Sequence, residues 1–180
     1  MKRSRAFAVW LTGLPGSGKS TITTELVRKL ADAGIEVAVL ESDRMRPILT
    51  PGAGYDETGR DTFYNALVHV GALLTHHGVP VVFDATANRR LYRDRARGRI
   101  PQFVEVHVEC PLEVCVERDP KGIYQQGSDG RTVDVPGLNV EYEAPIRPDI
   151  VVSGADGTAA GAADGIVELL GRRGYLSVSA

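Results

Sequence analysis

The sequence has little that would point to a secreted, membrane-bound or zinc-binding protein. It contains only two cysteines, Cys110 and Cys115, whose separation fits neither a C-x-x-C redox motif nor a zinc site, so we expect core thiols in a reducing compartment. No apolar stretch approaches the length needed to cross a membrane. The basic segment 1–5 is followed by a short apolar run that leads into a glycine-rich loop, which predicts a strand and no signal peptide. We therefore expect a cytoplasmic protein with no membrane partner.

A marked excess of charge of one sign is also missing. The formal net charge is −2, which gives no general argument for binding nucleic acid, and we expect no nucleic-acid partner. The arginine-rich run at 89–99 could form a nucleic-acid patch, but in a net acidic chain we favour a solvated helix face with a few members touching phosphates. The Asn-Lys-x-Asp motif of Ras-like GTPases is absent, which weighs against a nucleotide-dependent switch.

What the sequence does contain is a phosphate-binding loop. Gly13, Gly18, Lys19 and Ser20 fill the pattern G-x-x-x-x-G-K-[ST]. Glycines let successive N–H groups point into one concavity, and the helix that begins near Lys19 directs its positive dipole end toward the same anion. Lys19 should reach the β- and γ-phosphates of ATP, and the Ser20 hydroxyl should bind Mg²⁺. The loop residues expected to bind ATP are Gly13, Leu14, Pro15, Gly16, Ser17, Gly18, Lys19, Ser20 and Thr21.

Strands and helices are expected to alternate along the chain. Apolar runs predict strands at 7–11, 35–40, 79–83, 103–108 and 150–152. Apolar spacing and stop signals predict helices at 19–33, 59–77, 89–99, 111–118 and in a last segment that includes 166–170. This order predicts an α/β fold, the three-layer P-loop NTPase/kinase fold, with a parallel five-stranded sheet and helices on both faces.

The remaining segments define the expected organisation of the domain. Residues 47–58 contain Pro and Gly and are expected to be a loop. The long, weakly periodic segment at about 119–148 is expected to be a lid. The length of the chain and its hydrophobic content of 43% suit a single kinase domain that spans residues 1–180.

Carboxylates are expected at the carboxyl edge of the sheet, where ligands bind in open α/β proteins. Asp43 follows the second strand and could accept a proton from an acceptor hydroxyl or hold a magnesium water, unless it is a turn or N-cap residue. Asp84 ends an apolar run and resembles the second acidic motif of phosphate-loop enzymes, although it could instead cap a helix. Glu41 could assist or be solvated. The expected metal ligands are Ser20, Asp43 and Asp84.

Cationic and aromatic side chains follow the second strand. The guanidinium groups of Arg44, Arg46 and Arg60 suit bidentate binding of phosphate or sulfate oxygens. Tyr55 could stack on a planar ring or belong to a small satellite core. These residues predict a small anionic acceptor beside the phosphate loop.

The residues quoted so far, with three further segments, resemble the adenylylsulfate (APS) kinase family over nearly the whole chain. These segments are Val9–Leu14, Pro111–Tyr124 and Pro136–Pro145. The stretch Arg118–Tyr124 is far more specific than a phosphate loop alone. Members of the family phosphorylate the 3′-hydroxyl of APS with Mg-ATP, so the resemblance implies a kinase of sulfate assimilation that uses ATP and Mg²⁺.

The resemblance also implies roles for single residues. Asp43 matches an acid expected at the reaction centre, and Arg118 matches a lid residue near ATP. The positions matched to the acceptor site are Arg46, Arg60 and Tyr55, and Lys121, which like Arg118 matches a lid residue around the nucleotides, is also expected to bind the substrate. The first two match arginines that bind the APS anion, and the third stands where a phenylalanine stacks near the APS adenine. A homodimer is left open as the assembly state.

The chain departs from the family pattern where APS would bind. Phe63 stands where the family has an APS-contacting asparagine, and Val135 stands where a second stacking phenylalanine is usual. Residues 84–89 replace a Ser-Pro-Tyr segment and look more like small phosphate-loop kinases with other acceptors. Each lost contact should cost on the order of 1–2 kcal/mol, so we expect APS to be accepted but weakly.

We therefore predict an ATP-dependent phosphotransferase that acts on a hydroxyl of a small anionic acceptor, with APS as the best candidate. Lys19 and Asp43 are the predicted catalytic residues. Two alternatives stay open. The first is a phosphate-loop kinase for a different hydroxylated metabolite, and the second is a nucleotide-binding switch without phosphotransfer.

Overall fold

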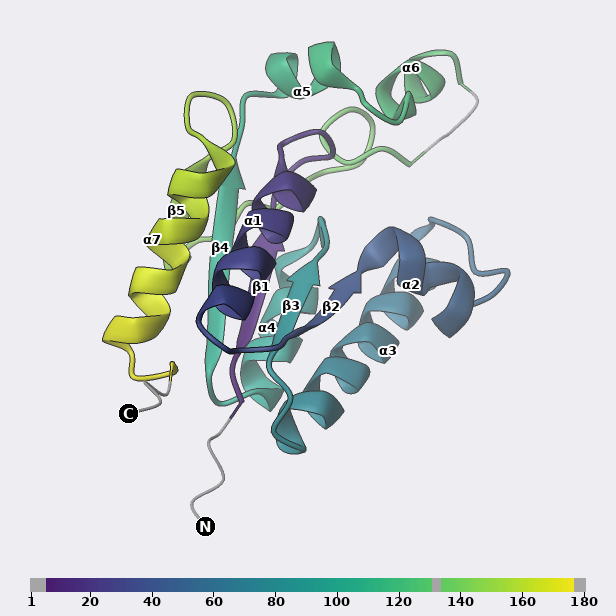
Figure 1. The fold of residues 1–180 in the computed structure, drawn as a ribbon. Coiled ribbons are helices and arrows are strands. Elements are labelled where there is room, and N and C mark those ends of the chain that lie inside the picture. The colour runs from purple at the N-terminus through teal and green to yellow at the C-terminus, as the bar shows by residue number, and fades with distance from the viewer. Residues whose placement is uncertain (1–5, 131–133, 177–180) are drawn as a thin grey trace.

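The computed structural model describes residues 6–130 and 134–176. Strands and helices alternate along these ranges (Figure 1). The strands are β1 (Ala8–Thr12), β2 (Ala38–Glu41), β3 (Val81–Asp84), β4 (Phe103–Glu109) and β5 (Ile150–Ser153). The helices are α1 (Lys19–Asp32), α2 (Ser42–Leu49), α3 (Glu57–His76), α4 (Arg90–Arg99), α5 (Leu112–Arg118), α6 (Ile123–Ser128) and α7 (Ala159–Arg172).

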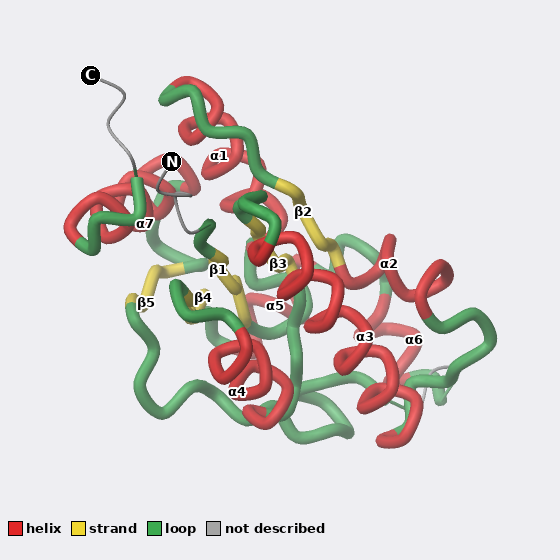
Figure 2. Tube along the Cα trace, turned by 90° about the horizontal axis from the view of Figure 1, so that it is seen from below, coloured by secondary structure: helices red, strands yellow, loops and turns green. Residues whose placement is uncertain are grey.

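The five described strands form one parallel sheet in the order β2-β3-β1-β4-β5. Figure 2 shows α1 and α7 on one side of this sheet and α3 and α4 on the other. The predicted α/β class, the parallel sheet and the three layers are therefore confirmed. Because the strands run in parallel, their carboxyl ends lie along one edge of the sheet, where ligands bind in open α/β folds.

The central strand β1 is buried along its whole length, as parallel strands covered on both faces are. Val9 and Leu11 pack with α1 and α7 on one side of the sheet. Trp10 faces the other side, where its ring stacks on Phe83 at a centroid distance of 4.5 Å and its Nε1 donates to the carbonyl of Ala85 at 3.0 Å. This packing fixes the position of the loop that follows β1.

The segment between β2 and α3 differs from its prediction. Residues 47–58 were expected to form a loop, but α2 continues through Pro47 to Leu49. Proline has no N–H to donate to the carbonyl of Asp43, yet its ring still fits the last turn of this short helix. The next helix begins earlier than predicted because the carboxylate of Asp56 caps it by accepting from the amide of Gly59 at 2.7 Å.

The segment expected to be a lid contains a short helix that the sequence pattern did not predict. The carboxylate of Asp119 accepts from the amides of Tyr124 and Gln125 at 3.2 and 3.0 Å, which satisfies donors in the first turn of α6. The hydroxyl of Tyr124 then donates to the carbonyl of Pro15 at 2.9 Å. A direct contact thus joins α6 to the phosphate loop.

The prediction of a solvated arginine face on α4 is wrong for several members of the run. Arg93 is only 1% exposed and donates to Glu105 on β4 at 2.7 Å. Arg97 pairs with both Glu105 and Asp149, and Arg95 pairs with Asp61 at 2.7 Å. Arginines of this run form ion pairs with acidic residues that belong to neighbouring elements and are distant in sequence.

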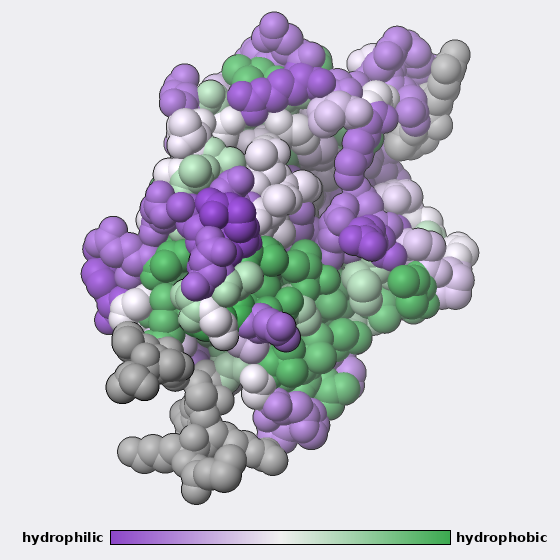
Figure 3. Space-filling model, viewed as in Figure 1, coloured by the Kyte–Doolittle hydropathy of each residue, from purple (hydrophilic) through white to green (hydrophobic). Residues whose placement is uncertain are grey.

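An apolar area covers β2 and the adjoining part of α3 on the surface of the molecule (Figure 3). Val39, Leu73 and Val79 are 40%, 52% and 37% exposed there.

In the part of the chain that the structure describes, no helix is long and apolar enough to span a bilayer. That residues 1–180 form a single domain stays a prediction.

Candidate active site

The loop between β1 and α1 has the backbone geometry of a phosphate cradle. Gly16 has a φ of +77°, and a Cβ there would lie 2.9 Å from the carbonyl oxygen of Cys115. Gly18 precedes the first residue of α1 with a φ of +99°. Side chains are disfavoured at both positions, and the glycines allow the loop amides to gather at the positive end of α1.

Lys19 lies inside this cradle. Its side chain is buried, and its Nζ donates to the carbonyls of Gly13 and Leu14 at 3.0 and 2.9 Å. Burial lowers the pKa of Lys19 to about 8, and the carboxylate of Asp84 is the strongest of the charges that oppose this shift. A phosphate anion would stabilise the ammonium form.

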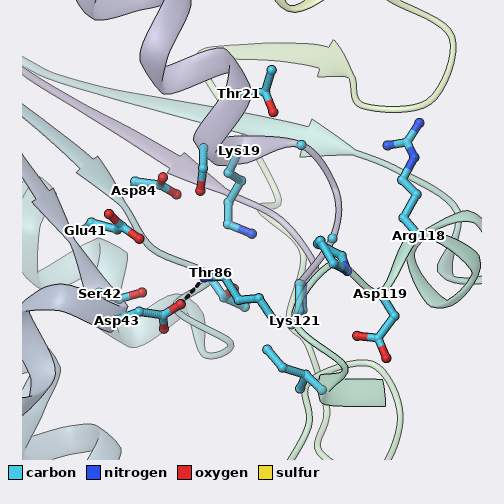
Figure 4. A pocket seen from close by; sticks show the side chains of 16 residues that line it. Lys19, Thr21, Glu41, Ser42, Asp43, Asp84, Thr86, Arg118, Asp119 and Lys121 are labelled. Carbon is cyan, nitrogen blue, oxygen red and sulfur yellow. Dashed lines mark hydrogen bonds and ion pairs between the residues drawn. The ribbon is translucent and has the colours of Figure 1, made fainter. Parts of the chain in front are cut away.

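A cavity of ≈ 620 Å³ opens in front of Lys19 (Figure 4). It brings together most of the residues that the sequence assigned to ATP and metal. The predicted residues that line it are Pro15, Gly16, Gly18, Lys19, Ser20, Thr21, Asp43, Asp84, Arg118 and Lys121. Gly13, Leu14 and Ser17 do not line it. The first two hold Lys19 through their carbonyls, and the Ser17 side chain is buried, with no hydrogen-bond partner for its Oγ among the described residues.

Three carboxylates lie along one side of this cavity, away from Arg118 (Figure 4). Glu41 and Asp84 end neighbouring parallel strands and are register partners. Asp43 belongs to the first turn of α2 and forms an ion pair with Lys121 of the expected lid. The hydrogen bond that Lys121 donates to Asp43 raises the pKa of Lys121. The structure places the acidic side chains together at this edge, and their role as metal ligands stays a prediction.

These oxygen donors suit a magnesium ion held jointly with ATP. Among residues 6–130 and 134–176, no group of three His, Cys, Asp or Glu side chains could enclose a metal by itself. Mg²⁺ in phosphate-transfer sites usually takes one or two carboxylates together with waters and substrate phosphates. The Ser20 hydroxyl and the buried Asp84 carboxylate supply donors of that kind beside Lys19.

A second cavity, of ≈ 290 Å³, adjoins the first, and the residues that line both are Pro15, Ser42, Asp43, Thr86 and Ile123. It contains the side chains that the sequence assigned to an anionic acceptor. Those that line it are Arg46, Tyr55 and Arg60. Arg46 and Arg60 are both buried residues, 8% and 6% exposed, so two cations face one small space.

The two arginines are held differently. Arg60 donates to the carbonyl of Tyr55 at 2.5 Å, to Oδ1 of Asn88 at 3.1 Å and to the carbonyl of Asp134 at 2.6 Å. Arg46 instead lies over aromatic rings. Asn88 belongs to the segment that departs from the family pattern, and it ties Arg60 to the loop after β3.

The two other departures from the family pattern lie outside the set of cavity-lining residues. Phe63 is fully buried beneath Arg46, with the guanidinium carbon 4.0 Å from the ring centroid. Val135 is fully buried in a cluster with Tyr124 and the cysteines. Cys110 and Cys115 are both free and buried, which confirms the prediction of core thiols.

Sequence reasoning missed several lining residues. Thr86 borders both cavities and is held by its carbonyl, which accepts from the hydroxyl of Thr12 at 2.6 Å. Its place two residues after Asp84, at the same edge of the sheet, was the signal available. Tyr64 lines the acceptor cavity from α3, and its hydroxyl accepts from the amide of Ala87 at 3.0 Å. Nothing in the local sequence pattern singled out Tyr64.

Comparisons with known proteins agree with this geometry. Residues 5–153 match the family described as adenylylsulphate kinase. An adenylyl-sulfate kinase of Rippkaea orientalis is 43% identical over 148 residues, which is 82% of each chain. One of a Synechococcus species is 36% identical over 172 residues, which is 96% of this chain and 98% of that one.

A solved structure extends the likeness to three dimensions. The Mycobacterium tuberculosis APS kinase, in complex with AMPPNP and APS, superposes with a TM-score of 0.88 and 33% sequence identity. The likeness covers 93% of this chain and 98% of that one. With its phosphate loop, its parallel sheet and these relatives, the chain belongs to the adenylylsulphate kinase family of P-loop kinases.

Proposed function

We propose that this protein is an ATP-dependent kinase that phosphorylates the 3′-hydroxyl of APS and releases PAPS and ADP. The observation that carries the proposal is the junction of the two cavities at Asp43. One cavity contains the phosphate loop, and the other contains two buried arginines beside an aromatic ring. The relatives' names and the APS and AMPPNP complex of one of them support this choice of nucleotide and acceptor.

The phosphate loop is proposed to hold the nucleotide. The loop residues 13–21 would surround the β- and γ-phosphates, with the ammonium of Lys19 neutralising their charge. Arg118 would contact ATP at the other end of the cavity, where its side chain donates to the carbonyl of Gly154 at 2.7 Å. The segment 119–148 is proposed to close over the nucleotide and exclude water.

The acceptor cavity is proposed to hold APS by charge and by stacking. Arg46 and Arg60 would bind the phosphosulfate, and Tyr55 would face the adenine. Lys121 would leave Asp43 and contact the acceptor. The acceptor hydroxyl oxygen would then attack the γ-phosphorus while the bond from that phosphorus to the bridging oxygen of ADP breaks. Asp43 would take the hydroxyl proton or orient the hydroxyl.

Magnesium is proposed to be held by Ser20 and Asp84, with Asp43 as a further donor. When bound, the ion neutralises charge that develops on the phosphates. The side chains of the phosphate loop and of the sheet edge keep the two substrates in line.

Acceptor-dependent ADP release tests the proposal. A kinase releases ADP only when its acceptor is present, whereas a switch hydrolyses ATP without one. A panel of APS and other hydroxylated anions, with PAPS formation measured for APS, would separate the proposed activity from that of a kinase for another metabolite. ADP release that responds to another acceptor and not to APS would favour that alternative.

The setting of the enzyme is also a proposal. Free thiols at Cys110 and Cys115 are compatible with a reducing, cytoplasmic compartment. A homodimer stays a prediction, and light scattering at micromolar protein concentration would measure the assembly state directly.

A further inference from the structure

Arg46 is a buried cation that lies near the carboxylate of Asp43 but forms no ion pair with it. Within the described ranges, no acidic side chain forms an ion pair with it, and its Nη1 is buried without a hydrogen-bond partner. Burial is the main factor that lowers the pKa of Arg46, and the nearby charge of Arg60 lowers it further. Buried charged groups are normally paired and hydrogen-bonded, so a guanidinium with an unpartnered nitrogen at the wall of a cavity indicates a site for an anionic ligand.

Two aromatic rings lie against this guanidinium. The guanidinium carbon lies 4.0 Å from the centroid of Phe63 and 4.5 Å from that of Tyr55. Phe63 is fully buried and packs edge-on against Tyr64 at 5.1 Å, whereas Tyr55 is half exposed. A cation over a desolvated ring is attracted more strongly than one over an exposed ring, so Phe63 is the firmer of the two contacts.

The mode of attachment matters for what Arg46 can still bind. The guanidinium of Arg60 donates hydrogen bonds to three oxygen atoms of the protein. Ring faces attract a guanidinium without accepting its in-plane N–H groups, so those of Arg46 stay available for a ligand. An amide side chain at position 63 would offer an oxygen that competes for the same N–H groups.

We propose that Phe63 is a positioning residue, which holds Arg46 by its flat face so that the in-plane N–H groups bind the oxyanion of the acceptor. The inference rests on the proposed function for the identity of the acceptor. Phe63 therefore contributes to acceptor recognition in this chain by a contact different from the hydrogen bond of an asparagine. It acts through Arg46 and does not line the cavity.

Steady-state kinetics of Phe63→Leu with APS and ATP test this role. Leucine keeps the site apolar but removes the ring, so the KM for APS should rise about tenfold while the KM for ATP stays near its original value. Phe103→Leu is the matched control, because Phe103 is also buried and has Arg97 over its ring at 5.1 Å but lies on β4. An APS KM raised equally in both variants, or in neither, would overturn the proposal.

A double-mutant cycle separates positioning from packing. In an Arg46→Met background, Phe63→Leu should cause no further rise in the KM for APS, because the residue it acts through is gone. A full additional effect in that background would assign Phe63 a purely structural role. If Phe63→Leu fails to fold, a trifluorinated phenylalanine at position 63 keeps the shape and weakens the negative ring face, and it should also raise the KM.

The contact itself can be measured without substrate. NMR of isotope-labelled arginine should show an upfield ring-current shift of the Arg46 side chain that becomes clearly smaller in the Phe63→Leu variant, where only the ring of Tyr55 remains. An unshifted Arg46 signal would contradict the positioning role. Absence of APS-dependent ADP from the unaltered enzyme would instead contradict the proposed function, so the two failures are distinguishable.

Discussion

Asp43 at the start of α2 and Lys121 in the expected lid form an ion pair, although 78 positions separate them in the sequence. Their side chains are 54% and 53% exposed, so the pair contributes little to stability. Its position is more informative, because Asp43 borders both cavities. The pair joins the expected lid to the point where the acceptor hydroxyl is proposed to lie.

Asp43→Asn should lower kcat by about 10²-fold or more, with a smaller effect on the affinity for ATP. The amide keeps the shape of the side chain but cannot accept the hydroxyl proton. Lys121→Ala is the matched comparison, since it removes the partner and leaves the carboxylate. An unchanged kcat in Asp43→Asn would make Asp43 a turn residue and direct attention to Asp84.

Lys19→Ala should abolish ATP-dependent phosphotransfer and leave a folded protein. Within residues 6–130 and 134–176, the hydrogen bonds of the lysine ammonium go to two loop carbonyls, and burial destabilises its charge, so its loss should not weaken the core. Circular dichroism and a coupled ADP assay would measure both properties. A folded variant with the original turnover would remove the basis of the assignment.

Binding of Mg-ATP should take up a proton above about pH 8. The pKa of Lys19 is about 8 without ligand, so much of the lysine is neutral there, and phosphates favour the ammonium form. The affinity for ATP should accordingly fall as the pH rises through this range. Calorimetry in buffers with different ionisation enthalpies would count the protons, which should approach zero at about pH 6.5. Lys19→Arg, whose side chain stays charged, should show no such uptake.

Glu105→Ala should be strongly destabilising. Arg93 is fully buried against Glu105, and an unpaired buried charge costs about 3–5 kcal/mol. Urea unfolding would measure the loss in the free energy of unfolding. Glu168→Ala removes an exposed pair with Arg172 and should be nearly neutral. Similar losses in the two variants would show that the Arg93 contact is not a buried ion pair in solution.

Local sequence patterns predicted those elements of the fold whose signals are contiguous in the sequence. The strand, glycine-rich loop and helix around Lys19 were predicted because the motif and its flanking apolar runs are contiguous. The helix through Pro47 was not predicted, because proline usually ends a helix. The short helix α6 was missed because its cap at Asp119 compensates for a weak apolar pattern.

At the site, the sequence predicted which side chains share one edge of the sheet but not the contacts between side chains of different helices. Lys19, Asp43 and Asp84 could be placed together because the carboxyl ends of parallel strands share one edge. The stacking of Arg46 on Phe63 could not be anticipated, since the two residues belong to different helices and their contact depends on how α2 packs against α3. For the same reason, the sequence predicted only that Phe63 lacks the hydrogen bond that an asparagine would make to APS.

Whether APS is the phosphoryl acceptor can be measured with a coupled ADP assay over a series of APS concentrations. We expect ADP release that depends on APS and saturates only at high APS concentration, because the asparagine and the second stacking ring of the family are replaced at Phe63 and Val135. A micromolar or lower half-saturating concentration would mean that contacts such as the stacking of Arg46 on Phe63 compensate for them. No APS-dependent ADP at any concentration would contradict the account.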